Sequence, residues 1–398
     1  MKRTLLIKRI ALAVFRRLFA GVRLLAIRLR PLTHGAIEDR IQKKLNRIVE
    51  KNEHVSQALV LVCSKEHGFR KFFSAGLLGG KPIDVNQPFH VASIGKTFTA
   101  VLVGQLHQEG KIDFDDPVSK YLKTSLLRDL FVYEGIDYSD QITVRMLLGH
   151  TSGVADYFED PTQGQEKFLD VMKKNPNKMW MPDDLIEFTG KNQRAIDKPG
   201  STYHYSDTGY ILLGKLVEDV LNMPFYEALN RRIFQPLQMN DTYLMFYDHE
   251  DRLRPEIADV WLFGDNIKGL KSLSIDWAGG GLVSTLADLE TFVKSIYDGA
   301  LLGQETFEEM NRFDHIFEPG IEYGLGLMNI KFEDLFFLLD YLPDMKGHMG
   351  VLGTNMFYNP TTDLTYIASF GSTDYTEKSV RTMIEILSAL DHIEKPRL

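Results

Sequence analysis

The chain has little cysteine: Cys63 is the only one among 398 residues, so no intrachain disulfide can form. It closes the apolar run 58–62, and this position predicts a buried thiol. The 11 histidines form neither a His-Glu-x-x-His motif nor a paired Cys/His cluster, so we expect no metal site. Because the formal net charge is −8, we also expect no nucleic acid among the partners.

Acidic residues are missing from positions 1–37, which contain nine lysines and arginines. The longest stretch without charge before Pro31, 10–15, has only six residues and is too short to span a membrane. Basic residues recur there every seven positions, opposite an apolar stripe, at Lys2, Arg9, Arg16, Arg23 and Arg30. This pattern is typical of an amphipathic helix that lies in a membrane interface, and Pro31 should end it.

Residues 1–36 are therefore predicted as a separate basic segment that contacts a membrane surface through residues 1–30. The protein would then be peripherally membrane-associated, on a side of the membrane that the sequence leaves open. Two alternatives also fit the pattern. One is a mitochondrial-type targeting segment, although serine is absent from it, and the other is a basic arm that packs on the following domain.

Residues 37–398 carry strand patterns near both ends and helical patterns between them. Helices are predicted at 37–55, 208–221, 285–297 and 376–393, and residues 118–270 are mostly helical in pattern. Strands are predicted at 57–63, 69–76, 323–332, 335–341, 355–359 and 364–370. This order indicates one α/β domain over residues 37–398, whose sheet carries an inserted, mostly helical lobe at about residues 115–275.

The stretch 91–100 contains the only Ser-x-x-Lys tetrad of the chain, Ser93 to Lys96, ahead of an apolar run that predicts a buried helix. Positions i and i+3 share a helix face, so the Ser93 hydroxyl and the Lys96 amine can lie within hydrogen-bond reach. A serine needs a base beside it to become a nucleophile, and a lysine can be that base. The alternative is that the pair lies on an ordinary solvated helix face.

Two further stretches contain what a serine nucleophile also needs, a proton route and an oxyanion site. Residues 202–210 bring phenols, an imidazole and a carboxylate together just before a predicted helix. Residues 347–354 are rich in glycine and lead into a predicted strand, so their backbone N–H groups can approach a ligand closely. As an alternative, the tyrosines and His348 are ordinary core side chains.

Six motifs resemble, in the same order, those of the serine β-lactamase-like family, which includes class C β-lactamases, D-alanyl-D-alanine carboxypeptidases, D-aminopeptidases and esterases. The resemblance covers roughly residues 40–390. The motifs are Ser93-Ile94-Gly95-Lys96, Leu147-Leu148-Gly149-His150-Thr151-Ser152-Gly153, Tyr205-Ser206-Asp207, Ile233–Met239, Ala278–Thr285 and His348-Met349-Gly350. The resemblance implies a penicillin-binding-protein-like fold of the β-lactamase/transpeptidase type, with an antiparallel sheet flanked by helices.

The resemblance also implies roles for the matching residues. Ser93 would attack an ester or amide carbonyl and form an acyl-enzyme, without a metal or organic cofactor. Lys96 and Tyr205 would share the proton transfers, and which of them is the base stays open. The backbone N–H groups of Ser93 and of Val351, the residue after Gly350, would form the oxyanion hole.

Two positions bear on the substrate. His348 stands where many family members carry a lysine; if protonated it would help to hold a substrate carboxylate, and if neutral it would only orient its neighbours. Asp207 stands where the family usually has an asparagine, and an ionised aspartate cannot donate to the acylamide carbonyl of a peptide or β-lactam. It would instead tend to keep Lys96 protonated and shift proton acceptance toward Tyr205.

We therefore predict a serine hydrolase that is most like an esterase, with a small ester or amide as its substrate. D-alanyl-D-alanine carboxypeptidase, D-aminopeptidase and β-lactamase activities are the enzymatic alternatives. A scaffold protein with the same fold and weak catalysis is another, and a hydrolase acting on lipid-linked esters at the bilayer is a third. The sequence leaves the oligomeric state open.

Overall fold

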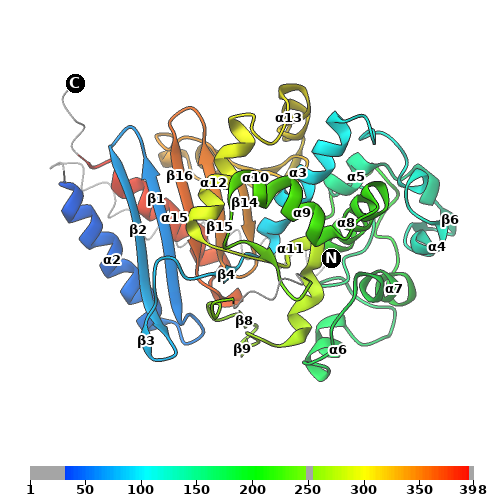
Figure 1. Ribbon diagram of the computed structural model, residues 1–398, viewed down its shortest axis with the longest axis horizontal. Helices are drawn as coiled ribbons and strands as arrows, with labels where there is room; N and C mark the ends of the chain where they lie inside the picture. Colours follow the sequence, from blue (N-terminus) through cyan, green and yellow to red (C-terminus); the bar gives the residue numbers. More distant parts are fainter. Residues whose placement is uncertain (1–31, 248–253, 394–398) are drawn as a thin grey trace.

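The computed structural model describes residues 32–247 and 254–393 (Figure 1). Its centre is a nine-stranded sheet of order β11-β12-β13-β14-β15-β16-β1-β2-β3, in which every neighbouring pair is antiparallel. The antiparallel sheet with flanking helices is therefore confirmed. The strands are β1 (Gln57–Ser64), β2 (Phe69–Leu78), β3 (Lys81–Pro82), β11 (His315–Glu318), β12 (Ile321–Tyr323), β13 (Met328–Ile330), β14 (Met345–Gly350), β15 (Thr354–Asn359) and β16 (Leu364–Ser369).

The two ends of the described chain meet in the middle of this sheet, where β1 pairs with β16 and Leu61 lies opposite Ile367. Every residue of β1 is buried, because helices cover both faces. Leu59 and Leu61 point into one core and Val60 and Val62 into the other, as expected from the alternation of side chains along a strand. The thiol of the neighbouring Cys63 is buried, as predicted.

Helices α2 (His34–Lys51) and α15 (Thr376–Leu390) cover one face of the sheet (Figure 1). The buried stripe of α2 has helical spacing and consists of Ile37, Ile41, Leu45 and Ile48. The opposite face packs against α12 (Leu286–Tyr297), which contacts β1, β15 and β16. The fold is therefore layered, with the helix-rich part of the chain on the α12 side (Figure 1).

Most of the other helices lie between β3 and β11 in the chain. They are α3 (Gly95–Gln108), α4 (Thr124–Leu127), α5 (Val144–Leu148), α6 (Phe168–Lys174), α7 (Pro182–Asn192), α8 (Asp207–Leu221), α9 (Phe225–Leu229), α10 (Gln235–Leu237), α11 (Trp277–Gly280) and α13 (Gln304–Met310). Short strands accompany them: β4 (Phe89–His90), β7 (Tyr243–Leu244) and β10 (Leu282–Ser284) form one sheet, and the pairs β5 (Val132–Tyr133) with β6 (Ile136–Asp137) and β8 (Trp261–Leu262) with β9 (Asp265–Asn266) form two ribbons.

Helix α3 is buried on all sides from Gly95 to Leu106, because apolar residues occur on every side of it and its polar residues are buried among them. Its two buried threonines donate to carbonyls of neighbouring segments, Thr97 to Gly326 at 2.9 Å and Thr99 to Ala278 at 2.6 Å. These bonds satisfy polar groups that would otherwise be costly to bury. They also fix the first turn of α3, where the Ser-x-x-Lys tetrad lies.

Some expectations from the sequence need correction, and others fall on residues that the structure does not describe. The predicted strand 335–341 is wrong: α14 (Phe332–Leu335) and a 3₁₀ turn at Phe337–Leu339 occupy this segment, and the Phe337 side chain is exposed. A short apolar run has no periodicity that distinguishes a strand from a helix. In the structure, local hydrogen bonds such as that from Leu339 N–H to Phe336 O form a turn here. Conversely, the glycine-rich 345–350 was not predicted as a strand, yet it forms β14 inside the sheet.

The predicted amphipathic helix falls on residues 1–31, which lie outside the described residues. Within residues 32–247 and 254–393, no helix is long and apolar enough to cross a membrane. The helix predicted at 37–55 begins earlier, at His34, and ends at Lys51, where the Asn52 amide donates to Ile48 O at 2.6 Å. The division at residue 37 and the limits of the helical lobe stay predictions.

Candidate active site

Ser93 lies in a 3₁₀ turn, Ala92–Ile94, directly before α3. It is half-buried, whereas Ala92 and Ile94 on either side of it are buried. Ala92 has a φ of +52°, a left-handed conformation that an alanine rarely adopts. Such backbone strain persists only where the surroundings hold it, and it is common at functional sites. The backbone conformation therefore indicates a functional site at this turn, as the sequence motif also does.

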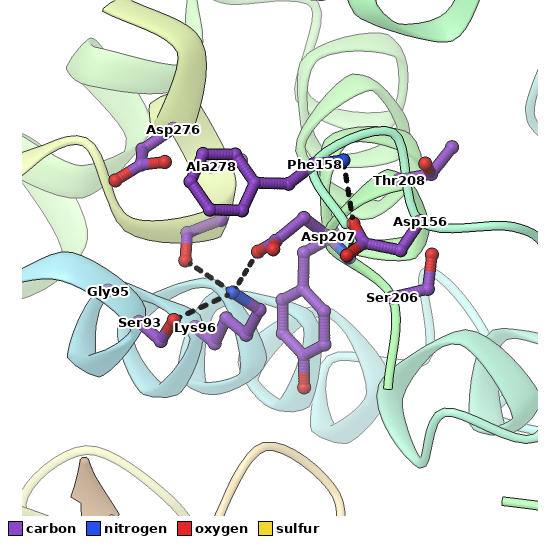
Figure 2. A network of polar contacts seen from close by, with 12 residues as sticks. Ser93, Gly95, Lys96, Asp156, Phe158, Ser206, Asp207, Thr208, Asp276 and Ala278 are labelled. Carbon is purple, nitrogen blue, oxygen red and sulfur yellow. Dashed lines mark hydrogen bonds and ion pairs between the residues drawn. The ribbon is translucent and has the colours of Figure 1, made fainter. Parts of the chain in front are cut away.

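Lys96 places its buried amine among three oxygen atoms (Figure 2). Nζ lies 3.3 Å from Ser93 Oγ and 2.9 Å from Gly279 O, and it forms an ion pair with Asp207. An ammonium group has three N–H donors and no acceptor, so this set of partners suits the protonated form. The predicted i, i+3 pairing of Ser93 and Lys96 is present, and Asp207 joins it.

Asp207 is the first residue of α8, so its carboxylate lies at the positive end of the helix dipole. Its own backbone N–H donates to Asp156 Oδ1 at 3.2 Å. Asp156 also accepts from the N–H groups of Phe158 and Glu159, at 3.2 and 3.0 Å. Burial and the charge of Asp207 raise the pKa of Asp156 well above its usual range. This second acid orients the start of α8 and thereby the partner of Lys96.

Tyr205 has its ring centre 5.0 Å from Lys96 Nζ. Burial raises the pKa of Tyr205 well above the usual value of a phenol, the nearby Asp207 charge raises it further, and a hydrogen bond with Ser93 lowers it in part. The structure thus brings four of the predicted side chains together, those of Ser93, Lys96, Tyr205 and Asp207. A phenolate is scarce at Tyr205 near neutral pH, because the acid form is so strongly favoured.

His348, on β14, is completely buried, and burial followed by the charge of Lys96 lowers its pKa to about 3. Its Nδ1 lies 2.7 Å from Met349 O, so the ring hydrogen belongs on this atom. Its Nε2 then accepts from Tyr323 Oη at 3.1 Å. Tyr323 Oη in turn lies 3.2 Å from His150 Nε2, whose ring accepts the Ser206 N–H at Nδ1.

This chain of hydrogen bonds from Ser206 to Met349 runs in one direction and keeps both imidazoles neutral. Burial also lowers the pKa of His150. A neutral His348 corresponds to the orienting role and not to electrostatic capture of a substrate carboxylate. Its part in substrate binding stays a prediction.

The end of β14 lies against the nucleophile turn. A Cβ atom at Gly350 would lie 3.0 Å from Ser93 N and 2.8 Å from Ala92 Cβ, so only glycine permits this approach. The Thr354 hydroxyl donates to Val91 O at 2.8 Å and holds the same two segments together. The backbone of Gly350 therefore lies beside Ser93, and the oxyanion role of the Ser93 and Val351 N–H groups stays a prediction.

Residues 278–281 supply backbone rather than side chains. Gly279 O accepts from Lys96, and a Cβ at Gly280 would lie 2.6 Å from Ala92 O.

Among the site residues that sequence reasoning missed are Asp156, Asp276 and Tyr323. Asp276 stands only two positions before the Ala278–Thr285 motif, which was the available signal, whereas nothing in the spacing singled out Asp156 or Tyr323. In the described part of the chain, no group of three or more His, Cys, Asp or Glu side chains is arranged to hold a metal ion.

Comparison with known proteins identifies the family of the chain. The family model described as Beta-lactamase matches residues 45–388. The chain belongs to the beta-lactamase family. Members of the beta-lactamase family of this type are serine hydrolases.

Individual beta-lactamase family members are moderately similar. Penicillin-binding protein 4* of Bacillus subtilis is 28% identical over 185 residues, which cover 46% of this chain and 36% of that protein. The D-stereospecific amidohydrolase of Streptomyces sp. has a TM-score of 0.71 at 29% identity, over 86% of this chain and 96% of its own. EstCE1, a hydrolase with promiscuous acyltransferase activity, has a TM-score of 0.69 at 20% identity, over 90% and 99%, and shows the fold alone. The chain spans about a third to two thirds of the length of the curated relatives it matches.

Proposed function

We propose that this beta-lactamase family protein hydrolyses small esters through an acyl-enzyme on Ser93, with amides of D-amino acids as the second substrate class. The observation that carries the proposal is the position of the Lys96 amine, which contacts Ser93 Oγ and the carboxylate of Asp207 at once. Because Asp207 has no N–H to donate, a substrate acylamide carbonyl loses a partner here. An ester without an acylamide group does not need this donor, so Asp207 does not remove any of its contacts.

The proton route in this proposal runs through Tyr205. Ser93 Oγ attacks the carbonyl carbon while its proton passes to Tyr205 Oη, and Tyr205 passes its own proton to the leaving oxygen or nitrogen. This concerted exchange needs no free phenolate, which suits the strongly raised pKa of Tyr205. Lys96 stays protonated and stabilises negative charge as it develops on Ser93 Oγ.

Hydrolysis of the acyl-enzyme uses the same groups in reverse. A water molecule attacks the ester carbon of the acyl-enzyme and gives its proton to Tyr205, which returns a proton to Ser93 Oγ as that bond breaks. The N–H groups of Ser93 and Val351 would stabilise the oxyanion in both steps. Removing one such donor typically costs about 10²–10³ in rate.

The amide alternative is favoured by one relative of similar fold. The Streptomyces protein is described as a D-stereospecific amidohydrolase, and at 29% identity it aligns over most of both chains. The same Ser93, Lys96 and Tyr205 would serve an amide, provided that Tyr205 protonates the leaving nitrogen. Amide substrates therefore belong in the same screen as esters.

The experiment is labelling of the purified full chain with a fluorophosphonate probe, wild type beside Ser93→Ala, read by intact mass. We expect one adduct on the wild type and none on the variant, because only an activated serine reacts at neutral pH. A screen of esters, D-amino-acid amides and β-lactams then ranks the substrates. A folded wild type that takes up no adduct would refute the proposed function and favour a scaffold protein.

A further inference from the structure

Asp276 lies beside the site and has no part in the proton route. It ends the 3₁₀ helix Lys271–Asp276 and precedes α11, whose Gly279 carbonyl accepts from Lys96. Its side chain keeps 23% of its surface exposed, so a ligand can reach it. Figure 2 shows Asp276 near Ala278, on the segment that leads into α11, and α11 packs against α3 and the Ser93 turn.

The charges around Asp276 are unbalanced. The ammonium of Lys96 is already paired with Asp207, and both His150 and His348 are neutral. Within the described ranges 32–247 and 254–393, Asp276 accepts no hydrogen bond, and its nearest basic atom is His90 Nε2, at 3.9 Å. The carboxylate of Asp276 therefore lacks a cation of its own.

His90 gives a second, independent observation. Its side chain is completely buried, and Nδ1 accepts the Ala92 N–H at 3.2 Å, so the ring hydrogen belongs on Nε2. Nε2 has no hydrogen-bond partner among the described residues and faces Asp276. The imidazole thus holds an unused N–H 3.9 Å from the carboxylate, too far for a hydrogen bond, so both groups are left without a partner.

We propose that Asp276, supported by His90, binds a free ammonium group on the acyl side of the substrate. The preferred substrates would then be esters or amides of amino acids whose amine is unblocked, an inference that rests on the proposed acyl-enzyme function. An ammonium supplies both the charge and the N–H donors that the carboxylate lacks. A substrate with no donor at this point leaves the partly buried carboxylate of Asp276 unpaired. This penalty makes the site discriminate more strongly against such a substrate.

The proposal also accounts for the chemistry at position 207. N-acylated substrates such as β-lactams and D-alanyl-D-alanine peptides place a neutral acylamide beside the reacting carbonyl. Neither Asp207 nor Asp276 donates to its carbonyl oxygen when ionised. Because positions 207 and 276 carry acids where an acylamide needs hydrogen-bond donors, the site favours a substrate with a free amine over one whose amine is acylated.

The test compares two esters with the same skeleton, phenylalanine methyl ester as both enantiomers and methyl 3-phenylpropanoate, which lacks the amine. We expect wild-type kcat/KM to favour the amine-bearing ester by about tenfold or more at neutral pH, a typical return for a charge-assisted hydrogen bond. In Asp276→Asn the ratio should fall to near one. The matched control is Asp219→Asn, which removes the same charge from an exposed position at the far end of α8 and should keep the wild-type ratio.

A binding measurement separates this inference from the proposed function. Ser93→Ala protein is titrated by calorimetry with phenylalaninamide and with 3-phenylpropanamide, so that no turnover is needed. We expect the amine-bearing compound to bind about tenfold more tightly, and the difference to vanish in Ser93→Ala/Asp276→Asn. Equal binding of both compounds, or a preference that survives Asp276→Asn, would overturn the inference whether or not esters are hydrolysed.

Discussion

At the scale of single residues, the site depends on one buried cation and the acids around it. Lys96 is fully buried, and burying an ammonium is costly unless an opposite charge and further acceptors accompany it. Asp207, Gly279 O and Ser93 Oγ supply these partners. Removing one member of such a buried pair typically costs about 3–5 kcal/mol of stability, so the pair has a structural role as well as a catalytic one.

The surroundings of Asp276 disfavour the ionised form of its carboxyl group. Its pKa is raised to about 7 from the usual 3.8, first by burial and then by the charge of Asp207, with Lys96 opposing the shift. The folded chain therefore binds this proton more tightly than the unfolded chain does. The protonated carboxyl therefore contributes to the stability of the fold. This contribution is fully present below the unfolded pKa of 3.8, falls as the pH rises, and is lost once the pH passes the folded pKa, near 7.

Asp276→Asn should remove this pH dependence. We expect the free energy of unfolding of the variant, relative to wild type, to rise by on the order of 4 kcal/mol between about pH 4 and pH 8. Urea unfolding at several pH values measures the difference, and changes in all other titrating groups cancel in it. A difference that stays constant with pH would mean that Asp276 titrates as an ordinary exposed acid.

At the scale of elements, glycines bring backbone segments close to the nucleophile. Gly280, at the end of α11, packs against the Ala92–Ser93 peptide, and Gly350, at the end of β14, lies beside Ser93 N. A side chain at either position would need space that backbone atoms already fill. The position of Ser93 is therefore determined by two elements that are far from it in the sequence.

Gly280→Ala tests this placement. Its new Cβ would lie 2.6 Å from Ala92 O and 3.2 Å from Ser93 N, so the nucleophile turn must shift. We expect the rate of fluorophosphonate labelling to fall by about a hundredfold, as for displacements near 1 Å at other active sites. The control is Gly35→Ala in α2, where a Cβ meets nothing within 4 Å. Labelling of folded Gly280→Ala at the wild-type rate would contradict the idea.

Sequence patterns predicted the local parts of this picture and missed those that depend on distant contacts. The Ser93–Lys96 spacing predicted their pairing because it is a property of one helical turn, and the family resemblance added Tyr205 and Asp207. The neutral state of His348 depends on Tyr323 and His150, which come from other elements. The place of Asp276 likewise depends on how α11 packs on α3, which no local spacing reveals.

Errors in secondary structure had a physical cause of the same kind. Residues 335–341 are apolar without a clear period, so their conformation is decided by what they pack against. Residues 345–350 contain two glycines, which disfavour a strand in isolation, yet β13 and β15 on either side hold them in the sheet as β14. Tertiary context overrode local preference in both segments.

At the scale of the whole molecule, positive charge gathers near the start of the chain although the net charge is −8. Residues 1–37 contain nine basic residues and no acid. The exposed face of α2 continues this pattern with a stripe of helical spacing, Arg40, Lys43, Arg47 and Lys51. We propose that this end of the molecule contacts anionic membrane surfaces, where each basic residue near the surface contributes about 1 kcal/mol.

Deletion of residues 2–31 tests the membrane proposal. We expect the full chain to pellet with vesicles that contain phosphatidylglycerol, and the shortened chain to pellet much less, because it lacks all nine of these charges. Neutral phosphatidylcholine vesicles and added salt serve as controls, since both should weaken an electrostatic contact. Equal pelleting of the two chains would contradict the proposal.

The pairing of β1 with β16 has a consequence for protein synthesis. β1 and the Ser93 turn leave the ribosome early, but the strands that complete the sheet, β14 to β16, follow only after residue 345. Until then β1 presents an unpaired, apolar edge of the kind that promotes aggregation. Nascent chains of this protein should therefore occupy chaperones for most of translation, and premature stop codons before β16 should produce degraded chains rather than partly active ones.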